Sequence, residues 1–223
     1  LNTIVAHQLR AFKKSVDALI AKGVKKDEAI LRELRDLIAE SKSIRFEGNG
    51  YGEEWRLEAE KRGLSNIADT PRALDVWDRK ETKKLFADMG VLSAVELEAR
   101  HEIELHSYML KIQIESRVAG DLAQNHIIPT AITYQNRLID NVKGLREVLG
   151  AEKAKKATAA QIVLIEEISE HISAIMNLVN EMVAARKKAN SIEEARAKAI
   201  AYCDKVKPFL DQIRYHSDKL ELL

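Results

Sequence analysis

Hydrophobic residues recur every three or four positions along most of this chain, which is the spacing of amphipathic α-helices. The pattern runs through residues 1–22 and stops at Gly23, a residue type that commonly ends helices. A second stretch covers residues 29–38, and Asp27 and Glu28 precede it, where the helix dipole favours acidic side chains. The sequence therefore begins with two predicted helices of medium length.

The pattern breaks after these helices. Residues 48–52 contain three glycines and predict a loop, whereas residues 53–62 predict a short helix closed by Gly63. Thr70 is the predicted N-cap of a further short helix, with Pro71 at its first position. This middle part is expected to form a compact connector of loops and short helices.

The longest helical patterns follow the connector. Ser93 with Glu96, and Ser191 with Glu194, each match a capping box, the pattern that opens many helices. Apolar residues then alternate at spacings of three and four, which is typical of a coiled-coil seam. In the last two patterns these predicted seam residues include Ile165, Ile168, Ile172, Ile175, Val179 and Met182, and then Ala199, Tyr202, Val206, Phe209 and Ile213. We predict three long helices, over about residues 94–149, 158–188 and 192–222. Short polar turns join them, so they are expected to pack antiparallel as a bundle.

Two prolines and one charged segment modify this bundle. Pro129 is expected to kink the first long helix, because it cannot donate a hydrogen bond to the carbonyl of Asn125, and the third helix continues across Pro208. Residues 151–157 predict a charged turn. The predicted fold class is all-α, with short helices followed by an antiparallel bundle of three long, partly kinked helices.

Composition and charge exclude several classes of protein. With 46% hydrophobic and 32% charged residues, the sequence is that of a soluble globular protein. The net charge of +1 and the lack of a basic stripe argue against nucleic-acid binding. No apolar run approaches the ~20 residues of a membrane span, no signal peptide opens the chain, and a lone cysteine excludes an internal disulfide. The chain opens in mid-helix pattern without Met, which suggests a piece of a longer protein.

Two histidines, His101 and His106, invite comparison with a zinc-binding motif. They are five residues apart, so they lie about 140° apart on a helix and cannot both face one ion. A di-iron bundle would need paired Glu-x-x-His motifs on facing helices. Glu98 with His101 is one such spacing, but Ile168 precedes His171 where the second glutamate is needed. Neither metal site is supported.

The glycine-containing loop does not match a phosphate-binding loop. Glu53 stands where a dinucleotide fingerprint needs its third glycine, and no Gly-Lys-Ser/Thr follows. We interpret the loop as a turn between two helices, with a contact loop for a neighbouring site as the alternative.

Polar residues also occur at predicted seam positions, namely His126, Gln135, Arg186 and His216. Such groups more often set helix register or cap a freed carbonyl than bind a small molecule. Cys203 has no neighbouring residue that would activate a nucleophile. We predict no catalytic, cofactor-binding or metal-binding residue in this chain.

Four strings of the sequence resemble the C-terminal part of the type III glutamine synthetases, the large bacterial form of that enzyme. They are KKDEAILRELRDLIAESKSIRFEGNGY (residues 25–51), EEWRLEAEKRGLSN (53–66), TPRAL (70–74) and LEARHEIELHSYMLKIQIESRVAGDLAQNHIIPTAITYQNRLIDNVKGL (97–145). The likeness is continuous over essentially the whole chain, and strings of this length rarely match by chance.

This resemblance implies a parent enzyme that joins ammonia to glutamate with ATP and Mg or Mn ions, in a cytoplasmic ringed homo-oligomer. The family's catalytic residues belong to segments that precede Leu1, so no cofactor is expected in this piece. The implied organisation is residues 1–42 as two helices continuing from a catalytic domain, 43–92 as the connector, and 93–223 as the bundle. The implied partners are the protein's own catalytic domain and neighbouring subunits, without nucleic acid or membrane.

Two functions follow as alternatives. The first is a helical accessory and assembly region of the amidating ligase, and the second is a stand-alone helical sensor or adaptor module. One feature bears on assembly: a second apolar stripe, formed by Leu110, Ile114, Val118 and Leu122, accompanies the seam of the first long helix. A helix with two apolar faces needs two sets of neighbours. Either residues 1–92 or another subunit is expected to cover it.

Overall fold

Helices account for every regular element of the chain, and no strand is present. The structure is a computed structural model that describes residues 1–223. Its contacts divide the chain into two compact units, residues 1–101 and residues 102–223. The all-α fold class is confirmed, while the three-part division into residues 1–42, 43–92 and 93–223 stays a prediction.

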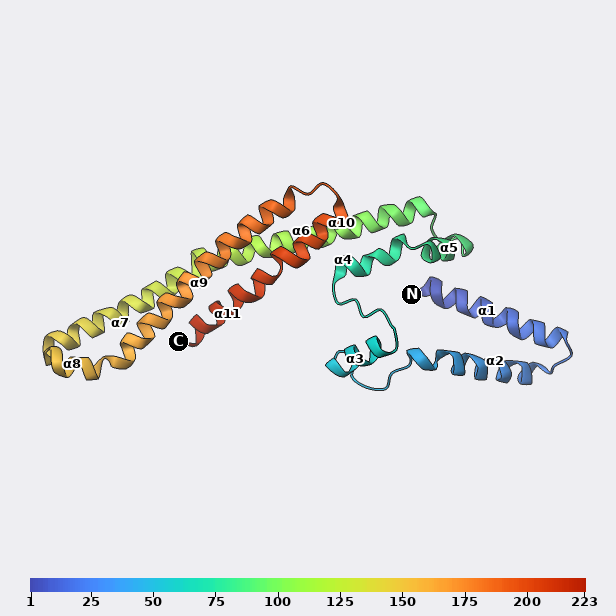
Figure 1. Ribbon diagram of the computed structural model, residues 1–223, viewed down its shortest axis with the longest axis horizontal. Helices are drawn as coiled ribbons and strands as arrows, with labels where there is room; N and C mark the ends of the chain where they lie inside the picture. Colours follow the sequence, from blue (N-terminus) through green and yellow to red (C-terminus); the bar gives the residue numbers. More distant parts are fainter. The chain divides into compact units, whose positions relative to one another are not determined.

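The first unit contains short and medium helices. They are α1 (Asn2–Ala21), α2 (Lys26–Glu40), α3 (Glu53–Lys61), α4 (Thr70–Ala73), α5 (Lys80–Asp88) and the start of α6 (Ala94–Leu122), with short 3₁₀ turns η1 (Ser41–Ile44) and η2 (Leu74–Asp78) between them. Helices α1 and α2 pack side by side as a hairpin, and α1 also contacts α5 (Figure 1). Gly23 makes the reversal between α1 and α2 at φ +88°, as its predicted role as a helix stop requires.

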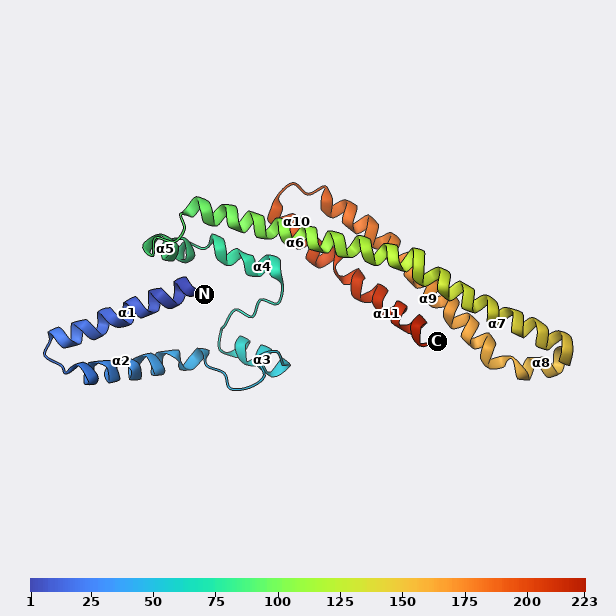
Figure 2. The ribbon, with the colours of Figure 1, turned by 180° about the vertical axis from the view of Figure 1, so that it is seen from behind.

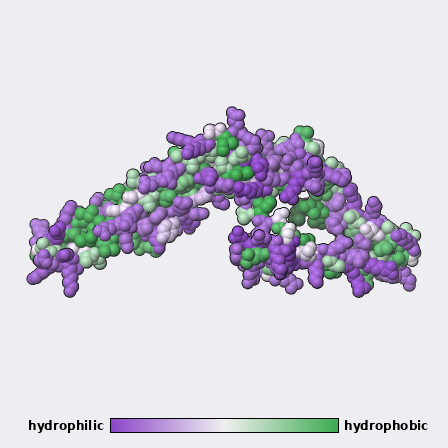
Figure 3. Space-filling model, viewed as in Figure 1, coloured by the Kyte–Doolittle hydropathy of each residue, from purple (hydrophilic) through white to green (hydrophobic).

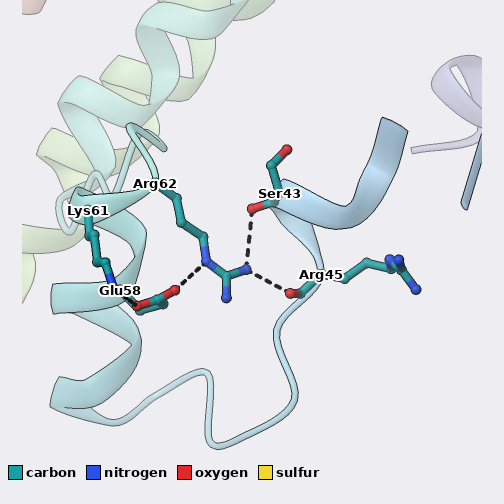
Figure 4. Close-up of polar contacts among 5 residues, drawn as sticks. All are labelled: Ser43, Arg45, Glu58, Lys61 and Arg62. Atoms are coloured by element: carbon teal, nitrogen blue, oxygen red, sulfur yellow. Dashed lines mark hydrogen bonds and ion pairs between the residues drawn. The ribbon is translucent and has the colours of Figure 1, made fainter. Parts of the chain in front are cut away.

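A guanidinium clasp fixes the connector to α3 (Figure 4). Arg62 donates to the carboxylate of Glu58 at 2.6 Å and to the backbone carbonyls of Ser43 and Arg45 at 3.3 and 2.7 Å. The hydrogen bond from Arg62 is the main reason that the pKa of Glu58 lies below its ordinary value. One side chain thus ties the segment that follows α2 to the end of α3.

The second unit is the predicted antiparallel bundle. Helix α6 continues through η3 (Ala123–Ile127) into α7 (Ile128–Leu149), and the return helices are α9 (Ala159–Asn190) and α10 (Ala195–Ala201), which runs through η4 (Tyr202–Val206) into α11 (Pro208–Leu222). Both ribbon views show α7 beside α9 and α9 beside α11 (Figures 1 and 2). The three predicted long helices are confirmed, with bounds shifted by a few residues.

Both prolines of the bundle follow a π-helical turn. The N–H of Ile128 donates to the carbonyl of Ala123, and the N–H of Lys207 donates to the carbonyl of Tyr202 at 2.9 Å, each five residues back. The next residue is proline in each case, which has no N–H to continue the α-helical ladder. The predicted kink at Pro129 is therefore a widened turn, and Pro208 repeats it.

Three local predictions were wrong. Residues 151–157 form a short helix, α8 (Ala151–Ala157), rather than a turn, and bury Ala154 against their neighbours. The N-cap of α4 is Asp69, one residue before Thr70, because its carboxylate accepts from the N–H of Arg72 at 3.0 Å. Ser191 also does not cap a helix, since its hydroxyl donates back to the carbonyl of Lys188.

The N-termini of α6 and α10 are capped in different ways. At the start of α6 the predicted box is present, because Glu96 accepts from the N–H and hydroxyl of Ser93 at 2.7 and 2.8 Å. At α10 the N-cap is Glu194 itself, whose carboxylate accepts from the N–H groups of Arg196 and Ala197. A glutamate can take this role because its longer side chain still reaches the first turn.

The core of the bundle follows the predicted seam. On α9, Ile168, Ile175, Val179 and Met182 are each no more than 2% exposed. The facing residues of η4 and α11 are also buried, namely Tyr202, Val206 and Ile213. Gly120 of α6 lies beside this core, because a Cβ there would be in ordinary contact with Val179 at 3.5 Å and Met182 at 3.6 Å.

Candidate functional site

The histidines of the first long helix do not form a metal site. His101 is half-buried and its Nε2 has no hydrogen-bond partner, whereas His106 is exposed. The chain holds no group of three or more His, Cys, Asp or Glu side chains arranged to bind a metal ion. The prediction that this chain has no catalytic, cofactor-binding or metal-binding residue stays a prediction.

The glycine-containing loop is stabilised by its own backbone. The N–H of Gly52 donates to the carbonyl of Asn49, and the N–H of Tyr51 donates to the Asn49 side chain, both at 3.0 Å. Phe46 packs on Trp55 with ring centroids 4.8 Å apart, which fixes the entry to the loop. Tyr51 is fully exposed at the tip. The loop is therefore a hydrogen-bonded turn between η1 and α3.

The polar groups around Pro129 form hydrogen bonds within their own helix. Asn125 donates to Asp121 at 2.7 Å, and the carbonyl of His126 accepts from the hydroxyl of Thr130 at 2.8 Å. The side chain of His126 is exposed, so the prediction that it occupies the seam was wrong. The extra residue in the π-helical turn rotates this position out of the seam.

Gln135 does lie at the seam and joins two helices. Its side-chain amide donates to the carbonyl of Ile165 at 2.8 Å and to the hydroxyl of Ser169 at 2.7 Å. Arg186 is half-buried near Tyr202, whose pKa is raised by burial, and the hydroxyl of Tyr202 donates to Asn190 at 2.7 Å. These contacts fix the register of α9 against its neighbours, which is the role predicted for seam polar groups.

A pair of histidines connects α9 and α11. The Nδ1 atoms of His171 and His216 lie 2.9 Å apart, so one imidazole donates and the other accepts. Burial, and secondly the neighbouring charge of His171, lower the pKa of His216. The sequence placed His216 at a seam but did not indicate its partner. The sequence predicted antiparallel packing but not the axial register that places these two residues at the same level.

Cys203 and the two lysines at the end of α9 show no sign of a catalytic or binding role. Cys203 is a free, half-exposed thiol within η4. Lys187 and Lys188 lie in the last turn of α9, where cations are stabilised by the helix dipole.

The second apolar stripe of α6 is the most prominent candidate surface. Its side chains are 56%, 52%, 51% and 48% exposed, in the order Leu110, Ile114, Val118 and Leu122. By contrast, Leu105, Met109 and Ile112 of the same helix are at most 5% exposed. The helix therefore presents one buried and one open apolar face. None of the helices combines the length and apolar character that a membrane crossing requires.

The fold defines a class, an all-helical bundle with an open apolar face, and comparison with known proteins adds the family. A family model described as "Glutamine synthetase C-terminal domain" matches residues 29–146. The chain belongs to this family. The resemblance to glutamine synthetases is therefore confirmed.

Individual relatives match over more of the chain. A glutamine synthetase of Bacteroides fragilis (strain YCH46) is 46% identical over 222 residues, which are 100% of this chain and 30% of that protein. A type-3 glutamine synthetase of Dictyostelium discoideum is 27% identical over 99% of this chain and 30% of its own length. A glutamine synthetase of Butyrivibrio fibrisolvens is 26% identical over 88% of this chain and 27% of its own length. The chain thus spans about 30% of the length of the relatives that it matches.

Proposed function

We propose that this chain is the helical accessory region of a cytoplasmic, ATP-dependent ligase that joins ammonia to glutamate, and that its bundle supports assembly of that enzyme. Family membership and 46% identity to the Bacteroides fragilis protein across the chain support the first half of the proposal. They also favour this function over a stand-alone sensor or adaptor.

The residues of this chain do not fit the cofactors of such a ligase. No cluster of three or more potential ligands is available for Mg or Mn ions. The loop at residues 48–52 has no following Lys-Ser/Thr pair to hold a phosphate. Binding of ATP and metal ions is therefore assigned to other parts of the full-length protein, and no chemical step is assigned to residues of this chain.

The exposed apolar stripe of α6 supports the proposal that the bundle contributes to assembly. A helix gains stability by burying apolar area, at about 25 cal/mol per Å². Four half-exposed branched or long aliphatic side chains in a row leave that gain unused within the bundle. We propose that a neighbouring subunit covers this face, and the alternative is a segment of the same polypeptide, since this chain is less than a third of the length of its relatives.

Two lysines on the stripe test the assignment. Ile114→Lys with Val118→Lys in the full-length protein is expected to give smaller oligomers with unchanged helix content, measured by sedimentation velocity and circular dichroism. Gln124→Lys, at an exposed position in η3 of the same continuous helix, is the control for a single added charge. Insoluble or unfolded protein would instead assign the stripe to an intramolecular contact, and wild-type assembly would reject both.

Binding measurements test the accessory role. The chain on its own is expected to show no glutamine synthesis and no saturable binding of Mg-ATP by calorimetry. A dissociation constant below ~1 mM, equivalent to about 4 kcal/mol, would contradict the assignment of nucleotide binding to other parts of the protein.

A further inference from the structure

Two helices of the bundle bring a pair of imidazole nitrogens together. His171 lies on α9 and His216 on α11, and both ribbon views show these helices side by side (Figures 1 and 2). Their Nδ1 atoms are 2.9 Å apart, and their ring centroids are 5.1 Å apart with an angle of 55° between the ring planes. Unlike His101 and His106, which share one helix, these two rings face each other from different helices.

The separation of the two nitrogens is close to that of two ligands on one metal ion. Zinc binds imidazole nitrogen at about 2.0–2.1 Å and prefers four ligands in a tetrahedron, which places two such nitrogens ~3.4 Å apart. The observed separation of 2.9 Å is shorter than this by only about 0.5 Å. Small rotations of the two side chains cover such a difference, so the backbone of α9 and α11 can stay in place.

The rings can both present a lone pair without losing a proton overall. In the hydrogen bond one Nδ1 donates its N–H and the other accepts. A neutral imidazole carries its proton on either nitrogen, so the donor ring can hold the proton on Nε2 instead. Neither Nε2 atom is buried without a partner, so a proton at this position is not left unsatisfied. Both Nδ1 atoms are then available as metal ligands.

Water has room to complete the coordination of an ion at this pair. His216 lines a cavity of about 500 Å³ together with Asn177, Asp211 and Gln212, whose side-chain oxygens can accept hydrogen bonds from metal-bound water. One water occupies about 30 Å³ in the liquid, so two waters fit. Hydrophilic and hydrophobic patches lie next to one another on the surface of the second unit (Figure 3). An ion between its outer helices can therefore stay in contact with solvent.

We propose that His171 and His216 form a binding site for one zinc ion or a similar divalent transition-metal ion, held by both Nδ1 atoms and by water. Imidazole nitrogen suits zinc and copper, whereas Mg and Mn prefer oxygen ligands, so this site is distinct from the metal chemistry of the ligase. It needs only two side chains and is therefore compatible with the lack of any cluster of three or more ligands. It departs from the sequence-based prediction that the chain has no metal-binding residue.

The bound ion acts as a clamp between the two helices. A site with half the protein ligands of a structural zinc site is expected to have a dissociation constant of roughly 1–100 µM. Because the ligands come from α9 and α11, the folded bundle binds the ion and the unfolded chain lacks the site, so zinc favours the folded state by mass action. The clamp involves neither the α6 stripe nor glutamine synthesis.

Chemical modification of the full-length protein tests the site without any substitution. Diethylpyrocarbonate acylates an imidazole nitrogen that has a free lone pair, and a ring bound through Nδ1 carries a proton on Nε2 and has none. Zinc at about ten times its dissociation constant is expected to slow modification of His171 and His216 about 10-fold, measured for each residue by mass spectrometry. The exposed His106 and His126 are the internal controls, and magnesium is the control ion. No slowing at the pair, or equal slowing at all four histidines, would overturn the proposal.

Substitutions test whether both rings are needed. His171→Gln and His216→Gln each keep a hydrogen-bonding side chain, and each is expected to bind one zinc ion fewer per chain than the wild type in equilibrium dialysis. His126→Gln, which removes an exposed histidine, is expected to keep the wild-type stoichiometry. Zinc is also expected to slow hydrogen exchange in α11 of the wild type but not of His216→Gln. Wild-type stoichiometry in both variants of the pair would overturn the proposal, and the modification experiment decides it where a variant does not fold.

Discussion

The two units contain similar helical patterns but differ in how much of the pattern is buried. In the first unit the buried side chains are few and mostly small, namely Val16, Ala29, Ala59, Pro71 and Leu97. In the second unit the core is made of Ile, Val, Met and Tyr residues on α9, η4 and α11. Since burial of apolar area is the main stabilising contribution, the second unit is expected to be much the more stable.

The difference shows that an amphipathic pattern predicts an apolar helix face but does not show that another element buries it. In α1 and α2, Ile4, Leu9, Leu31 and Ile38 are all more than half exposed although they keep helical spacing. The hairpin buries only Val16 and Ala29 fully. Both helices therefore leave large apolar side chains exposed in this chain.

The largest effect is expected from a charge in the core of the second unit. Ile175→Asp places a carboxylate where the side chain is 0% exposed and has no partner, which costs several kcal/mol. This is a large share of the ~5–15 kcal/mol that holds a typical domain. Urea denaturation followed by circular dichroism is expected to show loss of the cooperative transition of the bundle.

Ile172→Asp is the informative comparison for this prediction. The seam pattern alone assigned Ile172 the same importance, but its side chain is half-buried and a carboxylate there reaches water. It is expected to shift the urea midpoint less than Ile175→Asp does. Equal shifts would mean that the two positions share one environment, contrary to the structure.

Sequence periodicity predicted the second unit better than the first for a physical reason. Strict spacings of three and four define which residues meet in a bundle, so Ile168, Ile175 and Val206 were identified as core. Periodicity did not distinguish Ile172 from Ile175, because it does not encode how far the third helix tilts across a seam. It also missed α8, because AEKAKKA is short and has no repeating apolar face, although Ala, Glu and Lys all favour a helix.

The candidate surfaces were predictable in part. The α6 stripe follows from the spacing of Leu110, Ile114 and Val118 and needs no structure. The contact of His171 with His216 and the clasp of Arg62 join residues 45 and 17–19 positions apart, and no local pattern signals such pairs. They depend on helix alignment and on a loop path that only the folded chain defines.

Hydrogen exchange is expected to show the next largest difference. Amides of α9 exchange only through unfolding of the bundle, whereas those of α1 and α2 exchange through opening of a hairpin with a small core. The chain alone is therefore expected to show protection in α9 that exceeds that in α1 and α2 by orders of magnitude. Similar protection in both regions would contradict the comparison of cores drawn above.

Acidification is expected to weaken the second unit specifically. Burial and the neighbouring His171 lower the pKa of His216 below its ordinary value of 6.5, so the folded state favours the neutral ring. This stability is fully present above the unfolded pKa and is lost as the pH falls from about 6.5 through the folded pKa. The urea midpoint of the bundle is expected to fall between about pH 7.5 and about pH 5.

His216→Gln is the control for this pH dependence. The amide keeps a polar group beside His171 but does not titrate, so the variant is expected to show a flatter midpoint across the same pH range. The variant Lys219→Gln, one turn along the exposed side of α11, is expected to keep the wild-type slope. An unchanged slope in His216→Gln would assign the pH dependence to other groups.

The smallest effect concerns the clasp in the first unit. Arg62→Lys keeps the charge but lacks the planar fork that reaches Glu58 and the carbonyls of Ser43 and Arg45 together. The segment at residues 43–52 is then expected to be cleaved faster in limited proteolysis, with little change in helix content. Arg56→Lys is the matched control, because Arg56 contacts only Glu53 within α3, at 3.1 Å. Equal cleavage in both variants would show that the backbone turn at Asn49, rather than Arg62, holds the connector in place.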